Sequence, residues 1–276
     1  MVPYNLMKCY FETDYLANFH YHNTVEDMLA PLASAGIHDI FWTQQGEGDF
    51  IYLKPEMSEI AHAVKKHGMA VIGVAAPHVF GPNRNCWSDD PLMRKTGVRL
   101  IENRMELAAR LGARIVWIPA PSPLPLNRDH ILKSLETLIA AAERRNVILA
   151  VESCIEEELA FVLDAFQTQR LAWCMQTALC SLGGRIESLL ERFGKRLALV
   201  RASDSTGYGL VRLLPFSGVI DWPSLIAIVK AVSPDVEFSL NVDVYSHLDC
   251  SQMEFLSRVR TAAERLALLW NRGIIK

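Results

Sequence analysis

Short apolar segments alternate with longer segments of helical periodicity along the whole chain. Eight apolar segments are rich in β-branched residues and predict β-strands, at 5–11, 37–42, 69–75, 114–119, 147–153, 171–176, 197–203 and 236–242. Their starts are spaced by 33 residues on average, which is about the length that a strand, a helix and two short loops require. Strands that are apolar on both faces and alternate with helices are typical of a parallel sheet covered by helices.

The segments between these strands carry helix signals. Asn23 and Glu26 have the spacing of a capping box before the segment 25–36, and Asp221 is placed to cap a helix that begins after it. The segment 251–270 predicts a long amphipathic helix at the end of the chain. Each predicted strand is therefore followed by a segment that can form a helix.

The number of these units favours one closed architecture. Eight strand–helix units within 276 residues predict an α/β fold, a single (β/α)8 TIM barrel. The alternative is an open, doubly wound sheet, but no G-x-G-x-x-G follows the first strand and no G-x-x-x-x-G-K-[ST] occurs anywhere. No Gly/Ser-rich or charged linker divides the chain, so residues 1–276 are predicted to form one domain.

Composition excludes several classes of protein. With 50% hydrophobic and 21% charged residues, the chain can bury a large core and is not disordered. A net charge of -3 argues against nucleic acid as a partner, and no apolar run approaches the roughly 18 residues of a membrane span. No signal peptide is apparent, and the six cysteines contain no C-x-x-C pair. We therefore expect reduced thiols in a cytoplasmic protein.

Polar residues end four consecutive predicted strands. Strands five to eight end in Glu152, Gln176, Arg201 and Asn241. The active site of a (β/α)8 barrel lies at the C-terminal ends of its strands. We therefore expect these four side chains to share a pocket, although a single polar residue at a strand end is an ordinary transition to a loop.

Several segments resemble a known family. LAVES, LAWCMQTAL, LALVRASDSTG, LLPFSGVIDWPSL and FSLNVDVY are similar to the second half of the xylose isomerase-like TIM barrels, a group of sugar isomerases and epimerases related to endonuclease IV. The most specific piece is PFSGVIDW, which resembles the family's glycine, apolar residue and Ile-Asp-Trp segment. KKHGMAVIGVAAPH and RMELAARLGARIVWIPAP fit the first half more loosely. The resemblance covers nearly the whole chain.

The resemblance also implies a divalent metal, manganese or magnesium, held by Glu, Asp, His and Glu on strands five to eight. Glu152 matches the first ligand, whereas Gln176, Arg201 and Asn241 stand at the other three positions. Arginine stays protonated and does not bind metals, and amide oxygens are weak neutral donors. We therefore expect a degenerate metal site without a metal or other cofactor. Asp243, on the same strand face as Asn241, is the alternative eighth-strand carboxylate.

Charge balance suggests what replaces the metal. The charges of Glu152 and Arg201 sum to zero, and a buried carboxylate requires a partner. We therefore predict that the guanidinium of Arg201 lies where the family's metal would lie and forms an ion pair with Glu152. The alternative is that Arg201 points to solvent and Glu152 binds a loop amide.

Three further residues are candidates for contact with a substrate. His78 ends the third strand, where the resemblance places the edge of the substrate site, although a structural role is the alternative. Asp204 keeps an aspartate of the family after strand seven. Arg212 follows in the next loop and could bind an anionic group, although exposed arginines are common. Together with Gln176 and Asn241, they make up the predicted substrate-binding set.

These features predict a sugar or sugar-phosphate isomerase or epimerase that transfers a proton at a small polyhydroxylated carbonyl substrate. Glu152 would be the base, and Arg201 would stabilise the enediolate in place of a metal. The alternative is a catalytically inactive barrel that binds a small polar ligand or a partner. A DNA-repair function like that of endonuclease IV needs several metal ligands and a basic face, which the sequence lacks. The oligomeric state stays open, a homo-oligomer included.

Overall fold

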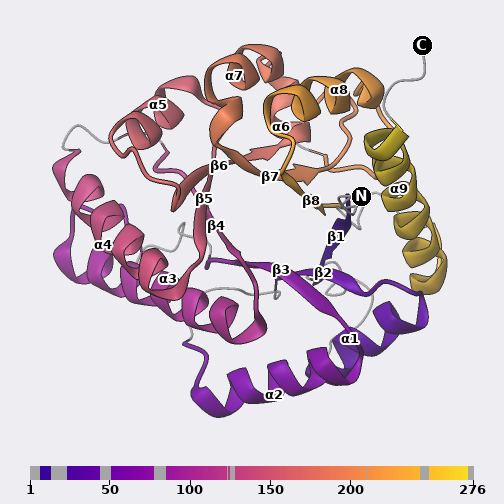
Figure 1. The fold of residues 1–276 in the computed structure, drawn as a ribbon, viewed down its shortest axis with the longest axis horizontal. Helices are drawn as coiled ribbons and strands as arrows, with labels where there is room; N and C mark the ends of the chain where they lie inside the picture. The colour runs from indigo at the N-terminus through magenta and orange to yellow at the C-terminus, as the bar shows by residue number, and fades with distance from the viewer. Residues whose placement is uncertain are drawn as a thin grey trace, which may run out of the picture.

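Eight parallel strands close into a barrel in chain order (Figure 1). The computed structural model describes residues 7–13, 24–43, 51–77, 85–122, 124, 128–209, 211–242 and 249–272. The strands are β1 (Cys9–Glu12), β2 (Asp39–Trp42), β3 (Ala70–Ala75), β4 (Ile115–Pro119), β5 (Ile148–Glu152), β6 (Leu171–Gln176), β7 (Leu197–Ala202) and β8 (Glu237–Leu240). Seven strands lie within their predicted segments, whereas β1 ends at Glu12, one residue beyond the predicted segment 5–11. The predicted single (β/α)8 TIM barrel is confirmed.

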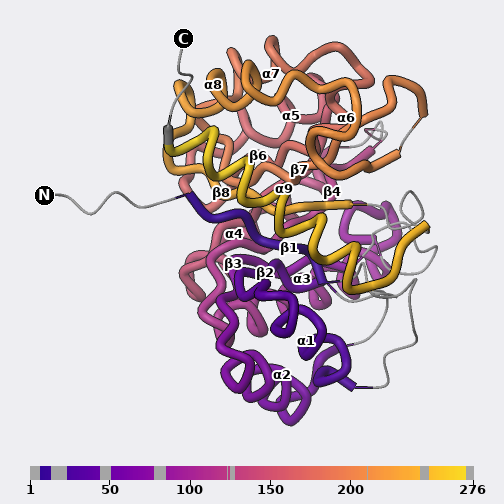
Figure 2. The backbone as a smooth tube through the Cα atoms, turned by 90° about the vertical axis from the view of Figure 1, so that its right-hand side faces the viewer, coloured from indigo at the N-terminus to yellow at the C-terminus, as the bar shows by residue number. Residues whose placement is uncertain are grey.

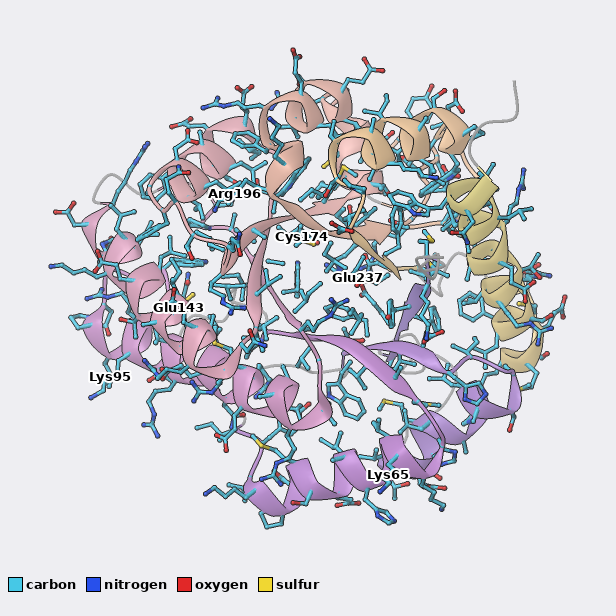
Figure 3. The ribbon with its side chains drawn as sticks, viewed as in Figure 1. Lys65, Lys95, Glu143, Cys174, Arg196 and Glu237 are labelled. Carbon is cyan, nitrogen blue, oxygen red and sulfur yellow. The ribbon has the colours of Figure 1, made fainter. Side chains whose placement is uncertain are left out.

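Helices surround the barrel. They are α1 (Val25–Ser34), α2 (Lys54–Lys66), α3 (Pro91–Leu111), α4 (Asp129–Arg145), α5 (Glu156–Asp164), α6 (Thr177–Leu182), α7 (Ile186–Phe193), the short 3-10 helix η2 (Gly194–Arg196), α8 (Trp222–Val232) and α9 (Gln252–Arg272). In Figure 2, α9 runs along the barrel, and it packs on β1. Figure 3 places Lys65, Lys95 and Glu143 on this outer ring. Within the described ranges, no helix combines the length and apolar character needed to cross a bilayer.

The start of α1 differs from the prediction. Thr24 is the N-cap, and its hydroxyl accepts a hydrogen bond from the Asp27 N–H at 3.1 Å. Glu26 does not complete a capping box, because its carboxylate binds Lys66 at 2.7 Å. Asn23, the predicted cap, lies outside the described residues. The helix is where the sequence places it, but its cap was assigned one residue too early.

The strands separate two apolar cores. A large core lies between the strands and the helices. A smaller one fills the barrel interior and consists of Tyr10, Phe41, Ile72, Ala75, Ile115, Trp117, Ala150, Cys174 and Leu199. Side chains two residues apart on a strand point the same way, so the polar residues that follow this inner core face inward above it. The barrel interior is therefore filled by apolar side chains along most of its length and is polar at the C-terminal ends of the strands.

Candidate functional site

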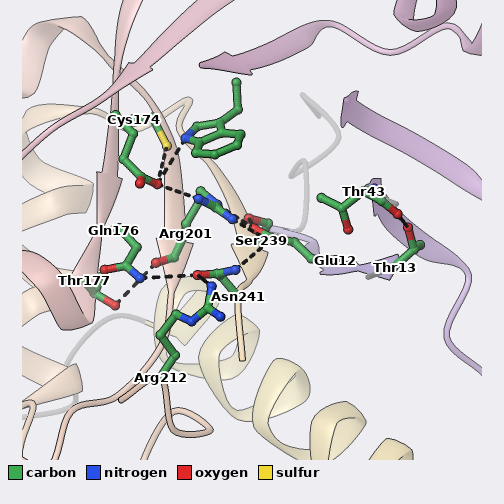
Figure 4. A network of polar contacts seen from close by, with 12 residues as sticks. Glu12, Thr13, Thr43, Cys174, Gln176, Thr177, Arg201, Arg212, Ser239 and Asn241 are labelled. Atoms are coloured by element: carbon green, nitrogen blue, oxygen red, sulfur yellow. Dashed lines mark hydrogen bonds and ion pairs between the residues drawn. The ribbon is translucent and has the colours of Figure 1, made fainter. Parts of the chain in front are cut away.

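Arg201 is the centre of a buried polar cluster at the C-terminal end of the barrel (Figure 4). Its Nε and Nη2 donate to the two carboxylate oxygens of Glu12, each at 2.7 Å. Its Nη1 donates to Oε2 of Glu152 at 2.6 Å. Arg201 is only 6% exposed. The predicted ion pair between Arg201 and Glu152 is confirmed, and the alternative in which Arg201 points to solvent is wrong.

Glu12 is a member of this cluster that the sequence prediction leaves out. It is the last residue of β1 and follows the inward-facing Tyr10 by two positions. The predicted first strand ends at Phe11, so the strand-end pattern that indicates Glu152 stops one residue short of Glu12. The formal charge of Glu12, Glu152 and Arg201 together is -1, so the predicted neutral pair of Glu152 and Arg201 was incomplete.

The carboxylate of Glu12 is saturated with hydrogen bonds. Its Oε1 accepts from Arg201 Nε and from the Ser239 hydroxyl at 3.1 Å. Its Oε2 accepts from Arg201 Nη2 and from Asn241 Nδ2 at 2.7 Å. A charge as deeply buried as this one is stable only with such partners. Glu12 therefore acts as a fixed counterion, with both oxygens occupied.

Glu152 lies on the other side of the guanidinium, and only one of its two carboxylate oxygens accepts hydrogen bonds from described residues. Its Oε2 accepts from Arg201 Nη1 and from Trp117 Nε1 at 3.1 Å, and the Cys174 thiol lies 4.0 Å away. Its Oε1 has no hydrogen bond within the described part of the chain. The side chain is 15% exposed, against 2% for Glu12. No described residue therefore occupies Oε1 of Glu152, and a ligand could contact it.

Arg201 is held as a permanent cation. Burial by itself lowers its pKa, but the negative charges of Glu12 and Glu152 outweigh burial and raise the pKa well above its ordinary value. The guanidinium also stacks 4.2 Å above the ring of Trp117. Its contacts use three of five N–H donors. Within the described part of the chain, one N–H on Nη1 and one on Nη2 therefore remain for a ligand oxygen.

The thiol of Cys174 lies beside this cluster on β6. Burial, and then the charge of Glu152, raise its pKa well above the ordinary value. The thiol is therefore neutral and is a poor nucleophile. Cys174 is a packing residue of the inner core.

The two predicted amides complete the cluster. Gln176 Nε2 donates to Asn241 Oδ1 at 3.3 Å, and Gln176 Oε1 accepts from the Leu179 N–H at 2.7 Å. Asn241 Oδ1 also accepts from Arg212 Nη1 at 3.2 Å. The structure thus brings Glu152, Gln176, Arg201, Arg212 and Asn241 into one connected network.

Asp204 is not part of that network. Its carboxylate accepts hydrogen bonds from Trp222 Nε1 at 2.8 Å and from the backbone N–H groups of Ser205 at 2.9 Å and Ile220 at 3.0 Å. It is fully buried, so these contacts tie both ends of the β7–α8 loop together. Gly218 lies against it, and a Cβ there would collide with Asp204 Oδ1. His78 and Asp243 lie outside the described residues.

The donor set does not fit the divalent metal that the family resemblance implies. The guanidinium of Arg201 lies between the carboxylates of Glu12 and Glu152 and binds both, and a guanidinium cannot bind a metal. The amides of Gln176 and Asn241 are bonded to each other. In the ranges that the structure describes, no group of three or more His, Cys, Asp or Glu is arranged to hold a metal.

Comparison with known proteins gives a family and a fold. The family model described as "Xylose isomerase-like TIM barrel" matches residues 29–265. A curated relative, "Uncharacterized protein y4fM" of Sinorhizobium fredii (strain NBRC 101917 / NGR234), is 23% identical over 282 residues, and the match covers 89% of each chain.

Solved structures share the architecture. A D-tagatose 3-epimerase-like protein superposes with a TM-score of 0.73 at 14% identity over 97% of this chain and 100% of its own. The 3-keto-D-glucoside 4-epimerase YcjR from E. coli superposes with a TM-score of 0.71 at 15% identity, over 95% of this chain and 99% of its own. The IOLI protein with a bound zinc atom superposes with a TM-score of 0.71 at 15% identity, over 96% of this chain and 99% of its own. At these identities the likeness shows the fold alone.

Proposed function

We propose a sugar isomerase or epimerase function for this chain, which belongs to the xylose isomerase-like TIM barrel family. The substrate would be a small polyhydroxylated carbonyl compound, and the reaction would be a proton transfer that does not use the family's divalent metal. The neighbouring folds include a D-tagatose 3-epimerase-like protein and a 3-keto-D-glucoside 4-epimerase, which supports the choice of a sugar.

One observation carries the proposal. Two neighbouring groups of the buried cluster have no partner among the described residues: the carboxylate oxygen Oε1 of Glu152 and two N–H donors of the cation Arg201. A carboxylate can take a proton from carbon, and fixed donors in a water-poor site stabilise the negative charge that then develops on oxygen. Both requirements of an enediolate reaction are present in adjacent side chains.

The step follows from these two roles. Glu152 Oε1 takes the proton from the carbon next to the carbonyl, the C–H electron pair forms a C=C bond, and the carbonyl pair moves onto oxygen. Arg201 stabilises that oxygen. Return of the proton to the former carbonyl carbon, with transfer of a hydroxyl proton between the two oxygens, completes the isomerisation.

The difference between the two glutamates favours isomerisation over epimerisation. Epimerisation by direct protonation on the opposite face needs a second base, whereas a shift of the proton between adjacent carbons needs one. Glu12 is the second carboxylate of the cluster, but four hydrogen bonds occupy its oxygens. Among the described residues of the cluster, Glu152 alone offers a free carboxylate oxygen.

The proposal is tested by incubating the purified protein with a panel of ketoses and aldoses in deuterated water with a chelator. We expect deuterium at the carbon next to the carbonyl, and a loss of exchange of about 100-fold or more in Glu152→Gln. Glu157→Gln removes an equal charge from an exposed residue of α5 and should exchange like the wild type. Exchange that persists in Glu152→Gln, or that requires a stoichiometric metal, would contradict the proposal.

A second candidate is a barrel that binds a polar ligand without converting it. The saturation of Glu12 favours it, because the usual pair of free carboxylates is reduced to one. In that case a sugar would raise the melting temperature of the wild type, and no carbon of that sugar would exchange with solvent.

A further inference from the structure

Arg212 is a partly buried cation at the barrel mouth that has no ion-pair partner among the described residues. Its Nη1 donates to Asn241 Oδ1 at 3.2 Å, but Asn241 is neutral. Among the residues that the structure describes, no carboxylate lies within ion-pair distance of Arg212. Arg201, by contrast, binds two carboxylates. With respect to the described residues, this one hydrogen bond leaves four of the five N–H donors of Arg212 unused.

The backbone holds Arg212 in place. The neighbouring residue, Leu213, forms a two-sided backbone bridge with Asp204, with N–O distances of 2.8 and 2.9 Å. The buried carboxylate of Asp204 binds Trp222, the first residue of α8. Arg212 therefore extends from a part of the β7–α8 loop that backbone and side-chain hydrogen bonds hold in place.

Asn241 connects Arg212 to the cluster. Its Oδ1 accepts from Arg212 while its Nδ2 donates to Glu12 at 2.7 Å, and Glu12 binds Arg201. Figure 4 shows Arg212 beside Asn241, with the guanidinium directed at the amide. A ligand that contacts Arg201 would therefore lie near a second guanidinium on the Asn241 side.

We propose that the mouth binds sugars that carry an anionic group, a carboxylate or a phosphate, and that Arg212 binds this group. The substrate class would then be a sugar acid or a sugar phosphate rather than a neutral sugar. A guanidinium with free N–H donors binds either group in a two-pronged, charge-assisted geometry. This inference rests on the proposed function, because it assumes that the carbonyl end of the same molecule faces Arg201.

The test compares three ligands that share one ketose skeleton. Isothermal titration calorimetry is run with D-fructose, D-fructuronate and D-fructose 6-phosphate on the wild type and on Arg212→Gln, which keeps a side chain able to donate to Asn241. We expect at least one anionic ligand to bind about 10-fold or more tightly than D-fructose, with the preference weakening as salt is added. Arg144→Gln removes an exposed arginine on α4 and should keep the preference.

Arg212→Gln should abolish the preference, so that the anionic ligands bind it no more tightly than D-fructose does, while the melting temperature stays close to that of the wild type. The two anionic ligands separate the sources of the charge: tighter binding of D-fructuronate indicates a sugar acid, and tighter binding of D-fructose 6-phosphate indicates a sugar phosphate. Equal affinities, including no detectable binding of any ligand, overturn the inference, as does a preference that survives in Arg212→Gln.

The calorimetric test of Arg212 and the deuterium exchange test of the proposed function can fail independently of each other. An anion preference that depends on Arg212, without deuterium exchange, would support the anion site and contradict the isomerase. Exchange into neutral sugars that Arg212→Gln does not alter would support the isomerase and overturn the anion site.

Discussion

The two ends of the barrel each carry an arginine–glutamate pair, and the two pairs differ in their surroundings. At the C-terminal end, the Arg201 and Glu12 side chains are 8% and 2% exposed. At the N-terminal end, Arg114 binds Glu237, with side chains 65% and 20% exposed. Figure 3 places Glu237 among the inner strands. At the N-terminal end the arginine of the pair is therefore solvated and its glutamate partly buried, whereas at the C-terminal end both side chains are buried.

The difference matters because solvent replaces a lost partner only where solvent is present. An exposed ion pair contributes little to stability, since water hydrates either ion when the other is removed. A buried ion that loses its partner cannot be rehydrated. The pair at the mouth is therefore part of the fold as well as of the site, whereas the pair at the opposite end is replaceable.

The largest expected effect is that of Arg201→Met. Two carboxylates lose their cation, one of them fully buried, so the free energy of unfolding should fall by about 3–5 kcal/mol. Arg114→Met at the other end is the matched control and should cost about 0–1 kcal/mol. Urea unfolding followed by circular dichroism measures both. Equal losses in the two variants would show that burial does not distinguish the two pairs.

A smaller effect on stability is expected when either glutamate bound to Arg201 is replaced, and the two replacements should differ. Glu12→Gln removes a charge that accepts four hydrogen bonds, and we expect it to lower the free energy of unfolding by about 1.5–3 kcal/mol. Glu152→Gln lies at the more exposed position and should cost about 1 kcal/mol or less while abolishing deuterium exchange. The reverse order of stability in urea unfolding would contradict the assignment of Glu12 as the fixed counterion.

The smallest effect concerns the N-terminal end and appears only at high pH. Burial, then the charges of Glu237 and Asp39, raise the pKa of Tyr10 from 10.0 to about 12. The folded protein thus keeps the phenol proton to a higher pH than the unfolded chain does. Stability is unaffected below pH 10 and falls as the pH rises toward 12, by about 1 kcal/mol at pH 11.

Tyr10→Phe tests this assignment, because it removes the titrating group and retains the ring. The difference in free energy of unfolding between wild type and variant, measured from pH 8 to 11, should change only above pH 10. A phenolate absorbance titration of the folded protein should place one tyrosine above the others. A pH-independent difference between the two proteins would disprove the buried titration.

The fold was predictable from sequence because strand and helix periodicities are local. Seven of the eight strands lie within their predicted segments, and β1 runs one residue past its predicted end. Asp221 caps α8 by accepting the Ser224 N–H, as predicted. The cap of α1 was misplaced because Asn23 and Thr24 are both good caps, and the choice depends on where Glu26 finds partners. Those partners, Lys66 and His67, are on another helix.

The site was only partly predictable, because its members come from distant strands. Glu152, Arg201 and Asn241 were found as strand ends, and the ion pair of the first two followed from charge balance. Glu12 contacts Arg201 across 189 residues of sequence, and no local pattern signals that pairing. The hydrogen bonds that hold Asp204 in its own loop also depend on the tertiary fold.

Trp117 gives the molecule a built-in optical reporter. Its indole N–H is hydrogen-bonded to Glu152, and its ring lies beneath the guanidinium of Arg201. Fluorescence from an indole changes in intensity and wavelength when a neighbouring charge is neutralised or displaced. Occupancy of the mouth should therefore be visible without a label, against the background of the other five tryptophans, as a spectral change that disappears in Trp117→Phe.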